Sequence, residues 1–201
     1  MKLIHLLNKL MKYGFPIYAL YQIIIMLTAN TYSRIAVTAS VFFLVLVPYL
    51  LKKIFHYKMT DIIEFIYLIF IFLAVILGSV VNLYSTIWWW DILAHTISGI
   101  LTSIVALLIL KRYNCLHNKK ALFVIIFMVT FSLGIASLWE FFEFAADNIT
   151  GGDTQWVLTT GVDDTMIDML VAFLGTSIFS IYYFIVSKTK SKSLTHLENL
   201  L

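Results

Sequence analysis

The sequence predicts an all-α protein, a polytopic transmembrane helical bundle of about six spans with both termini in the cytoplasm. Its 201 residues are 61% hydrophobic and only 12% charged, whereas soluble domains carry about 25% charged residues. Several apolar runs approach or exceed the ~20 residues that a helix needs to cross a bilayer. Alternating segments of about 10 residues, which are typical of a transmembrane barrel, do not occur.

The apolar runs and the loops between them give the predicted spans. They cover residues 15–29, 35–51, 62–81, 91–110, 121–147 and 164–186. The first span is short, and the basic residues before it resemble the start of a signal peptide. No small-x-small cleavage site ends this run, so we expect an uncleaved helix.

We expect one transmembrane domain over residues 1–201. Residues 1–87 hold the first three spans, residues 88–187 hold the three spans that carry the candidate site, and residues 188–201 form a cytoplasmic tail. Apart from Arg34, every basic residue lies in the N-terminal segment, the second and fourth connections or the tail: Lys2, Lys9, Lys12, Lys52, Lys53, Lys58, Lys111, Arg112, Lys119, Lys120, Lys188, Lys190 and Lys192. Because basic residues favour cytoplasmic loops, both termini are expected in the cytoplasm.

The tryptophans fit this orientation. Trp88, Trp89 and Trp90 precede the fourth span, and Trp156 lies in the last external connection. Aromatic belts favour such interfacial positions, so we expect these side chains to anchor the external interface.

Composition and motifs exclude several function classes. A net charge of +3 with basic residues confined to short loops does not indicate nucleic-acid binding. The lone Cys115 excludes an intramolecular disulfide and a cysteine-based zinc site. The chain has no G-x-S-x-G elbow, no phosphate loop and no H-E-x-x-H pair.

Acidic residues concentrate where the chain is most apolar. Eight of the eleven carboxylates lie among the last three spans, together with His95: Asp91, Glu140, Glu143, Asp147, Asp153, Asp163, Asp164 and Asp168. Each ionisable group near a helix centre costs roughly 2.5–3.5 kcal/mol on insertion. Mutual contacts, water or a metal ion must therefore satisfy those at membrane depth.

Helical spacing groups these residues at one end of the spans. Asp91 and His95 are four residues apart, as are Asp164 and Asp168, so each pair shares a helix face. Glu140 and Asp147 are two turns apart on the fifth span. Each group lies at the predicted external end, above small residues that let helices approach closely. We therefore expect the last three spans to surround one external acidic pocket.

Simpler interpretations exist for several of these residues. Asp91 and Asp164 begin spans, where Asp is a normal N-cap. Asp153 and Asp163 fit solvated loop acids, and Glu143 fits a side chain that points to headgroups. His95 taken alone fits a core histidine whose ring nitrogens have hydrogen-bond partners. Asp61 and Glu64 are expected to cap the third span. Glu140 and Asp168 resist these interpretations best, because neither is at a helix end and both have apolar neighbours.

Several carboxylates with one imidazole suit a divalent metal: Mg²⁺, Mn²⁺ or Ca²⁺, or Zn²⁺ through His95. We expect Glu140, Asp164 and Asp168 to hold the ion with His95. Asp91 would orient His95 or act as a base through a metal-bound water, so Asp91 and His95 are the catalytic candidates. Glu143 and Asp147 are secondary candidates.

Three motifs carry a family resemblance. Trp90 to His95 gives D-x-x-x-H at the start of a span, Trp139 to Glu143 gives E-x-x-E, and Asp164 to Met169 is followed by Gly175. Together they resemble the YjdF-like family of bacterial inner-membrane proteins of unknown function. More distantly, the order of motifs is similar to VanZ-like membrane proteins, although the Gln and Arg of that pattern are absent here. The resemblance implies a multi-span protein of the bacterial plasma (inner) membrane and supplies no established reaction.

Three functions fit these observations. The leading hypothesis is that this uncharacterised membrane protein is a metal-dependent enzyme. Its active site would be the external acidic and histidine site, and its substrate a lipid or lipid-linked headgroup. The alternatives are a non-catalytic scaffold with a structural polar network and a cation- or proton-coupled carrier. Membrane lipid is the expected partner, and the sequence indicates no nucleic acid and identifies no protein partner or substrate.

Overall fold

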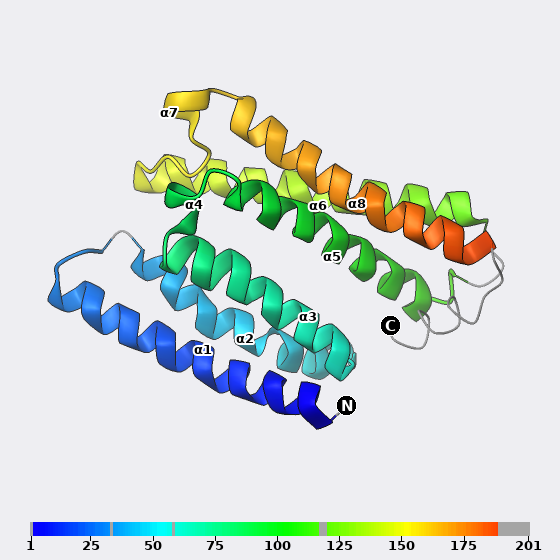
Figure 1. Cartoon of the computed structure of the whole chain (residues 1–201), viewed down its shortest axis with the longest axis horizontal. Coiled ribbons are helices and arrows are strands. Elements are labelled where there is room, and N and C mark those ends of the chain that lie inside the picture. Colours follow the sequence, from blue (N-terminus) through cyan, green and yellow to red (C-terminus); the bar gives the residue numbers. More distant parts are fainter. Residues whose placement is uncertain (1, 33, 58, 117–119, 189–201) are drawn as a thin grey trace. The chain divides into compact units, whose positions relative to one another are not determined.

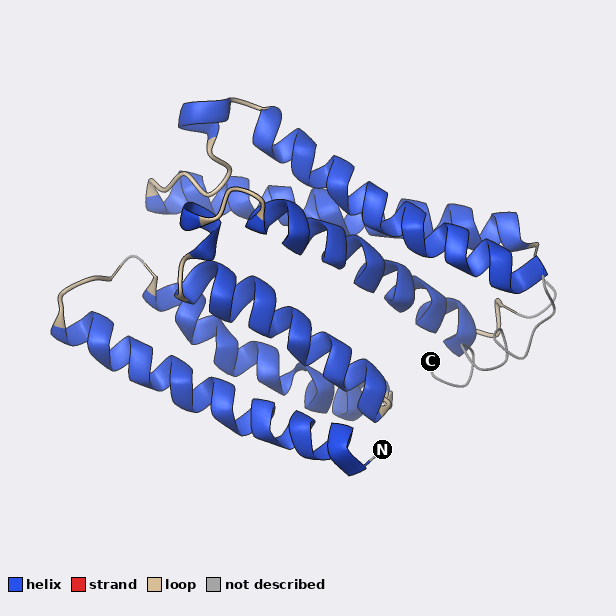
Figure 2. Cartoon of the chain, viewed as in Figure 1, coloured by secondary structure: helices blue, strands red, loops and turns tan. Residues whose placement is uncertain are grey.

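The computed structural model describes residues 2–32, 34–57, 59–116 and 120–188. This part of the chain is helical and contains no strand (Figure 2). Six of its helical segments are long and apolar enough to cross a membrane. The predicted fold class, an all-α protein with six candidate spans, is therefore confirmed. The cytoplasmic placement of the termini stays a prediction.

The helices follow one another with short connections (Figure 1). In chain order they are α1 (Lys2–Thr28), α2 (Ile35–Phe55), α3 (Asp61–Ile71), η1 (Phe72–Val80), α4 (Leu83–Thr86), α5 (Trp90–Arg112), α6 (Ala121–Thr150), α7 (Val157–Thr160) and α8 (Asp163–Lys188). The candidate spans are α1, α2, α3 with η1, α5, α6 and α8. Lys58, Lys119, Lys190, Lys192 and the predicted tail after Lys188 lie outside the described residues.

The first helix is longer than the sequence predicted. Its predicted start at residue 15 is wrong, since α1 begins at Lys2 and runs through Pro16. The basic residues that indicated a loop are Lys2, Lys9 and Lys12, and lysine, leucine and methionine are all good helix formers. The other five spans begin within about two residues of their predicted starts, as expected for boundaries of this kind.

Two compact units make up the chain, one ending at Trp90 and the other beginning at Asp91. In the first unit, α1, α2, α3 and η1 enclose a small apolar core that consists of Phe15, Ala19, Val41, Val45, Leu68, Ile71 and Ile76. The single-domain prediction stays a prediction.

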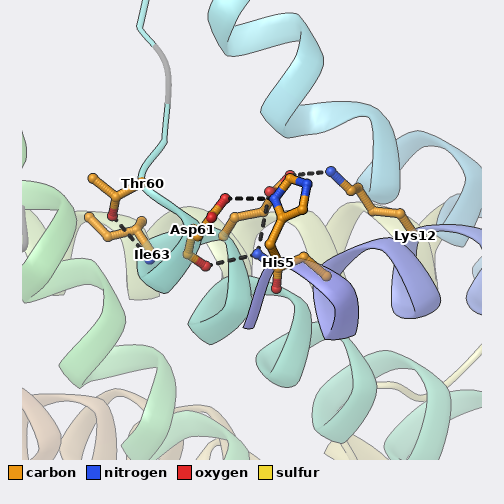
Figure 3. A network of polar contacts seen from close by, with 7 residues as sticks. His5, Lys12, Thr60, Asp61 and Ile63 are labelled. Carbon is orange, nitrogen blue, oxygen red and sulfur yellow. Dashed lines mark hydrogen bonds and ion pairs between the residues drawn. The ribbon is translucent and has the colours of Figure 1, made fainter. Parts of the chain in front are cut away.

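A polar network joins α1 to the start of α3 in the first unit. Figure 3 shows His5 and Lys12 of α1 reaching the α3 carboxylates, with His5 Nδ1 3.2 Å from Asp61 Oδ1. Lys12 Nζ lies 2.8 Å from Glu64 Oε1. The capping role expected for these acids belongs instead to Thr60, whose hydroxyl accepts from the backbone N–H of Ile63. The long α1 supplies a side-chain partner to each of these carboxylates, His5 to Asp61 and Lys12 to Glu64.

Trp90 departs from its expected role as an interface anchor. Trp88 is 83% exposed, but Trp90 is buried and its Nε1 donates to the carbonyl of Leu73 at 3.2 Å. A buried indole N–H needs such an acceptor. Trp90 therefore packs inside the first unit.

The second unit is built from α5, α6 and α8. Its apolar core consists of Ala106, Leu107, Leu110, Val124, Met128 and Tyr183. This core lies toward the C-terminal half of α5 and the N-terminal half of α6. The candidate site residues lie at the opposite ends of these two helices and at the start of α8.

Candidate functional site

Glycines on α5 and α8 bring the backbones of these helices into direct contact. A side chain at Gly99 would overlap the carbonyl of Ala172, and one at Gly175 would overlap the carbonyl of Thr96. Only glycine fits at these two positions. His95 lies one turn before Gly99, and Asp168 lies one turn before Ala172. The close crossing therefore holds these two functional side chains beside each other.

A buried hydroxyl cluster ties α6 to this crossing. Ser132 Oγ lies 2.6 Å from both Thr102 Oγ1 of α5 and Thr176 Oγ1 of α8. Thr176 also donates to the carbonyl of Gly99 at 3.1 Å. The small and polar residues Ser137, Gly134 and Thr130 predict one inner side of this helix. Ser137 is half-buried and its hydroxyl lies 3.7 Å from Met169 Sδ of α8, but Thr130 is exposed and Gly134 has open space around it. Ser132 makes the contact instead, because the inner face of α6 is rotated from the predicted one.

His95 lies between two carboxylates at the start of α5 and α8. Its Nε2 is 3.4 Å from Asp91 Oδ1 and 3.4 Å from Asp168 Oδ2. One ligand atom from each of these residues lies within 4.8 Å of the other two. We call Asp91, His95 and Asp168 the histidine triad. Asp91 and His95 are half-buried, while Asp168 is 3% exposed.

Two carboxylates of α6 approach the same aspartate. Oxygen atoms of Glu140, Glu143 and Asp168 also lie within 4.8 Å of one another. We call these three residues the carboxylate triad. Glu140 is only 4% exposed, although an ionised group is rarely buried without compensation. Asp168 belongs to both triads, so the two groups form one continuous site.

The connection between α6 and α8 folds back onto this site. Asp147 Oδ1 accepts from the backbone N–H and the hydroxyl of Thr154, at 2.8 and 2.7 Å, and Oδ2 accepts from the N–H of Gln155. The buried Gln155 side chain then donates to the carbonyl oxygen and carboxylate of Glu140, at 3.2 and 3.3 Å, and to Thr165 Oγ1. Asp147 thus fixes the loop that positions Gln155 against Glu140.

The structure brings together most, but not all, of the residues that the sequence singled out. Asp91, His95, Glu140, Glu143 and Asp168 converge, whereas neither triad includes Asp164 or Asp147. Asp164 is half-buried at the start of α8, and Asp163 beside it is exposed. Asp153 accepts from the N–H of Leu158.

Sequence reasoning missed Gln155. A neutral side chain in a polar loop carries no periodic signal, and only the contact with Glu140 reveals its place.

The electrostatics of the site favour a cation. The chain has no Lys or Arg between residues 88 and 110 or between residues 121 and 187. His95 is thus the basic side chain that lies among the four converging carboxylates in the described part of these helices. Carboxylate oxygens with one imidazole form a donor set suited to divalent metals.

One comparison with known proteins identifies a family of predicted membrane proteins. The family described as "Predicted membrane protein (DUF2238)" matches residues 12–189, which include every residue of both triads. An uncharacterized protein of Thermotoga maritima is 28% identical over 130 residues, which cover 64% of this chain and 65% of that protein. The chain therefore spans less than two thirds of this relative's length. No solved structure matches the chain.

Proposed function

Starting from the fact that the chain belongs to the DUF2238 family of predicted membrane proteins, which is the YjdF family, we propose that it is a metal-dependent enzyme. It acts at the external face of the bacterial plasma membrane on a lipid or lipid-linked headgroup. A divalent cation is its cofactor.

The histidine triad carries this proposal. Three ligand atoms from two helices converge within 4.8 Å, on a crossing whose spacing is fixed by Gly99 and Gly175. Ligands on packed helices are held more firmly than ligands on loops, which a metal site requires. A bound cation also reverses the repulsion that an acidic site exerts on phosphate.

Such an ion supplies a nucleophile, because water bound to a divalent metal ionises far more readily than bulk water. Asp91 Oδ1 lies 3.4 Å from His95 Nε2, the same ring nitrogen that faces Asp168, so Asp91 would hold the ion together with His95 and Asp168. If Asp91 held the ion through one carboxylate oxygen, its second oxygen would remain available as a base. The protein thus contributes the ion's ligands and a base.

The surroundings of the acids favour a lipid-like substrate. Large apolar side chains of α6 flank Glu140 and Glu143 and are exposed: Leu138, Trp139, Phe141, Phe142 and Phe144. These residues face the acyl region when α6 spans the bilayer. A headgroup attached to hydrocarbon chains would meet the triads from this apolar side of α6.

Elemental analysis of the purified protein tests the proposal. Wild type is expected to retain a divalent metal, and Asp168→Asn is expected to lose it. Asp163→Asn is the matched control, because Asp163 is an exposed carboxylate at the start of the same helix. Wild type without metal, under conditions in which a known metalloprotein keeps its own, would favour a structural polar network. Ion flux in proteoliposomes that responds to Glu140→Gln would favour a carrier.

A further inference from the structure

The two triads share one carboxylate. Asp91 and His95 approach Asp168 from α5, and Glu140 and Glu143 approach it from α6. Asp168 itself comes from α8, so it faces a ligand pair on each side. A carboxylate in this position has one oxygen for each of two neighbouring cations, as in sites where two metals act together.

We infer that the site binds two divalent cations side by side, with Asp168 as the bridging ligand. Asp91 and His95 complete one position, and Glu140 and Glu143 complete the other. This inference rests on the proposed function and extends it from one ion to a pair.

The carboxylate triad has few hydrogen-bond donors around it. Asp168 and Glu140 are both more than nine-tenths buried. Within the described chain, Asp168 accepts no hydrogen bond, and its 3.4 Å contact with His95 is longer than a charge-assisted hydrogen bond. Glu140 Oε2 accepts one bond, from Gln155 at 3.3 Å. Buried carboxylates normally accept several hydrogen bonds, so these oxygens point to a further cationic partner.

Two dications would balance the charge of the site. A histidine that ligates a metal is neutral, so the two triads together carry four negative charges from Asp91, Glu140, Glu143 and Asp168. One dication in the histidine triad leaves Glu140 and Glu143 adjacent, to be neutralised by a proton or by a second cation. Two dications balance all four charges, which matters where the surrounding helices are apolar.

The spacing suits cations without large movement. Three atoms that are no more than 4.8 Å apart lie within about 2.8 Å of a common centre, and oxygen ligands of divalent cations lie at about 2.0–2.6 Å. A contraction of a few tenths of an ångström is enough in each triad. Mn²⁺ accepts both carboxylate and imidazole ligands, so it fits both positions.

Manganese binding to the full chain in detergent tests the inference. Metal-free wild type is dialysed against Mn²⁺, bound manganese is counted per chain, and the electron paramagnetic resonance spectrum is recorded. We expect two Mn²⁺ per chain with the signal of a spin-coupled pair. One Mn²⁺ at saturation, or two without coupling, overturns the inference and leaves a single-ion enzyme standing. No bound Mn²⁺ overturns the inference and also removes the support for the proposed function.

Variants assign the two positions. Glu143→Gln and Asp91→Asn are each expected to keep one Mn²⁺ and lose the coupled signal, and Asp168→Asn is expected to lose the coupling as well. Asp163→Asn is the control and should keep two coupled ions. A coupled pair that persists in Glu143→Gln contradicts the assignment. The number of Mn²⁺ ions bound by wild type tests the inference even if a variant fails to fold.

Discussion

Replacing Gly99 by alanine is expected to weaken metal binding, although Gly99 offers no ligand. The added Cβ would overlap the carbonyl of Ala172 on α8. The two helices must then separate until carbon and oxygen reach ordinary contact, a movement on the order of 1 Å. Overpacking of this kind typically costs about 1–3 kcal/mol.

The movement reaches the site because His95 and Asp168 lie one turn, about 6 Å, from Gly99 and Ala172 along their helices. Functional groups must be held within about 0.5 Å of their working geometry. A separation of twice that amount lengthens the 3.4 Å contact between His95 and Asp168. We expect metal affinity to fall by about 10–100-fold, as it does when outer-shell support of a metal ligand is lost.

Isothermal titration with Mn²⁺ measures the affinity, and melting temperature in detergent measures the stability. Gly134→Ala is the matched control, since the space around Gly134 on α6 is open. That variant should bind Mn²⁺ as wild type does and should gain a little helix stability. Unchanged Mn²⁺ affinity in Gly99→Ala would refute the claim that the helix crossing sets the ligand distance.

Two further predictions concern the supports of the site. Ser132→Ala removes the hydroxyl that links Thr102 and Thr176 at 2.6 Å, and we expect it to cost about 1–2 kcal/mol at roughly 0.6 kcal/mol or more for each bond within a membrane. A melting temperature equal to that of wild type would contradict this. Gln155→Leu removes the donor to Glu140 and Thr165, so titration should show weaker Mn²⁺ binding with little change in the melting temperature. Equal affinity for Mn²⁺ in this variant would show that the loop does not position Glu140.

The sequence predicted the fold well because its signals are local. Apolar runs and loop charges define spans without reference to tertiary contacts, and the starts of five spans follow from them. α1 is the exception, because basic residues before Phe15 indicate a loop by composition but extend the helix through contacts with Asp61 and Glu64. Those contacts link residues more than 50 positions apart, and no local pattern reports them.

Part of the candidate site was predictable, namely the ionisable residues whose spacing places them on one face of an apolar helix. Glu140 and Asp168 stand out as charges in apolar helices, and the four-residue spacing of Asp91 and His95 gives their common face. The rotation of α6 about its axis was not predictable, because Gly134 and Ser132 are both small and either fits a helix contact. The position of Gln155 depends on a loop folded back by Asp147. Helix spacing therefore predicts that most of these acids and His95 converge, and tertiary structure is needed to find their supports.

The last prediction separates a ligand site from a structural network. A charged carboxylate costs roughly 2.5–3.5 kcal/mol at a helix centre on insertion scales and less toward the helix ends, so several of them are expensive for a protein of typical stability. The three helices do not need these acids for packing, because the glycine crossing and the Ser132 hydroxyl already join them. Glu140→Gln removes a buried charge and keeps an acceptor for Gln155. If the acids serve a cation, this variant should melt higher than wild type in chelator, since the uncompensated charge is gone.

With Mn²⁺ present the order should reverse. Wild type gains about 2.7 kcal/mol when Mn²⁺ is at 100 times its dissociation constant, and the variant should gain less because its carboxylate triad is incomplete. A variant that melts lower than wild type in chelator would mean that the Glu140 charge itself stabilises the fold. The acids would then be structural, because a ligand site is least stable without its ion whereas a polar network is least stable without its charges.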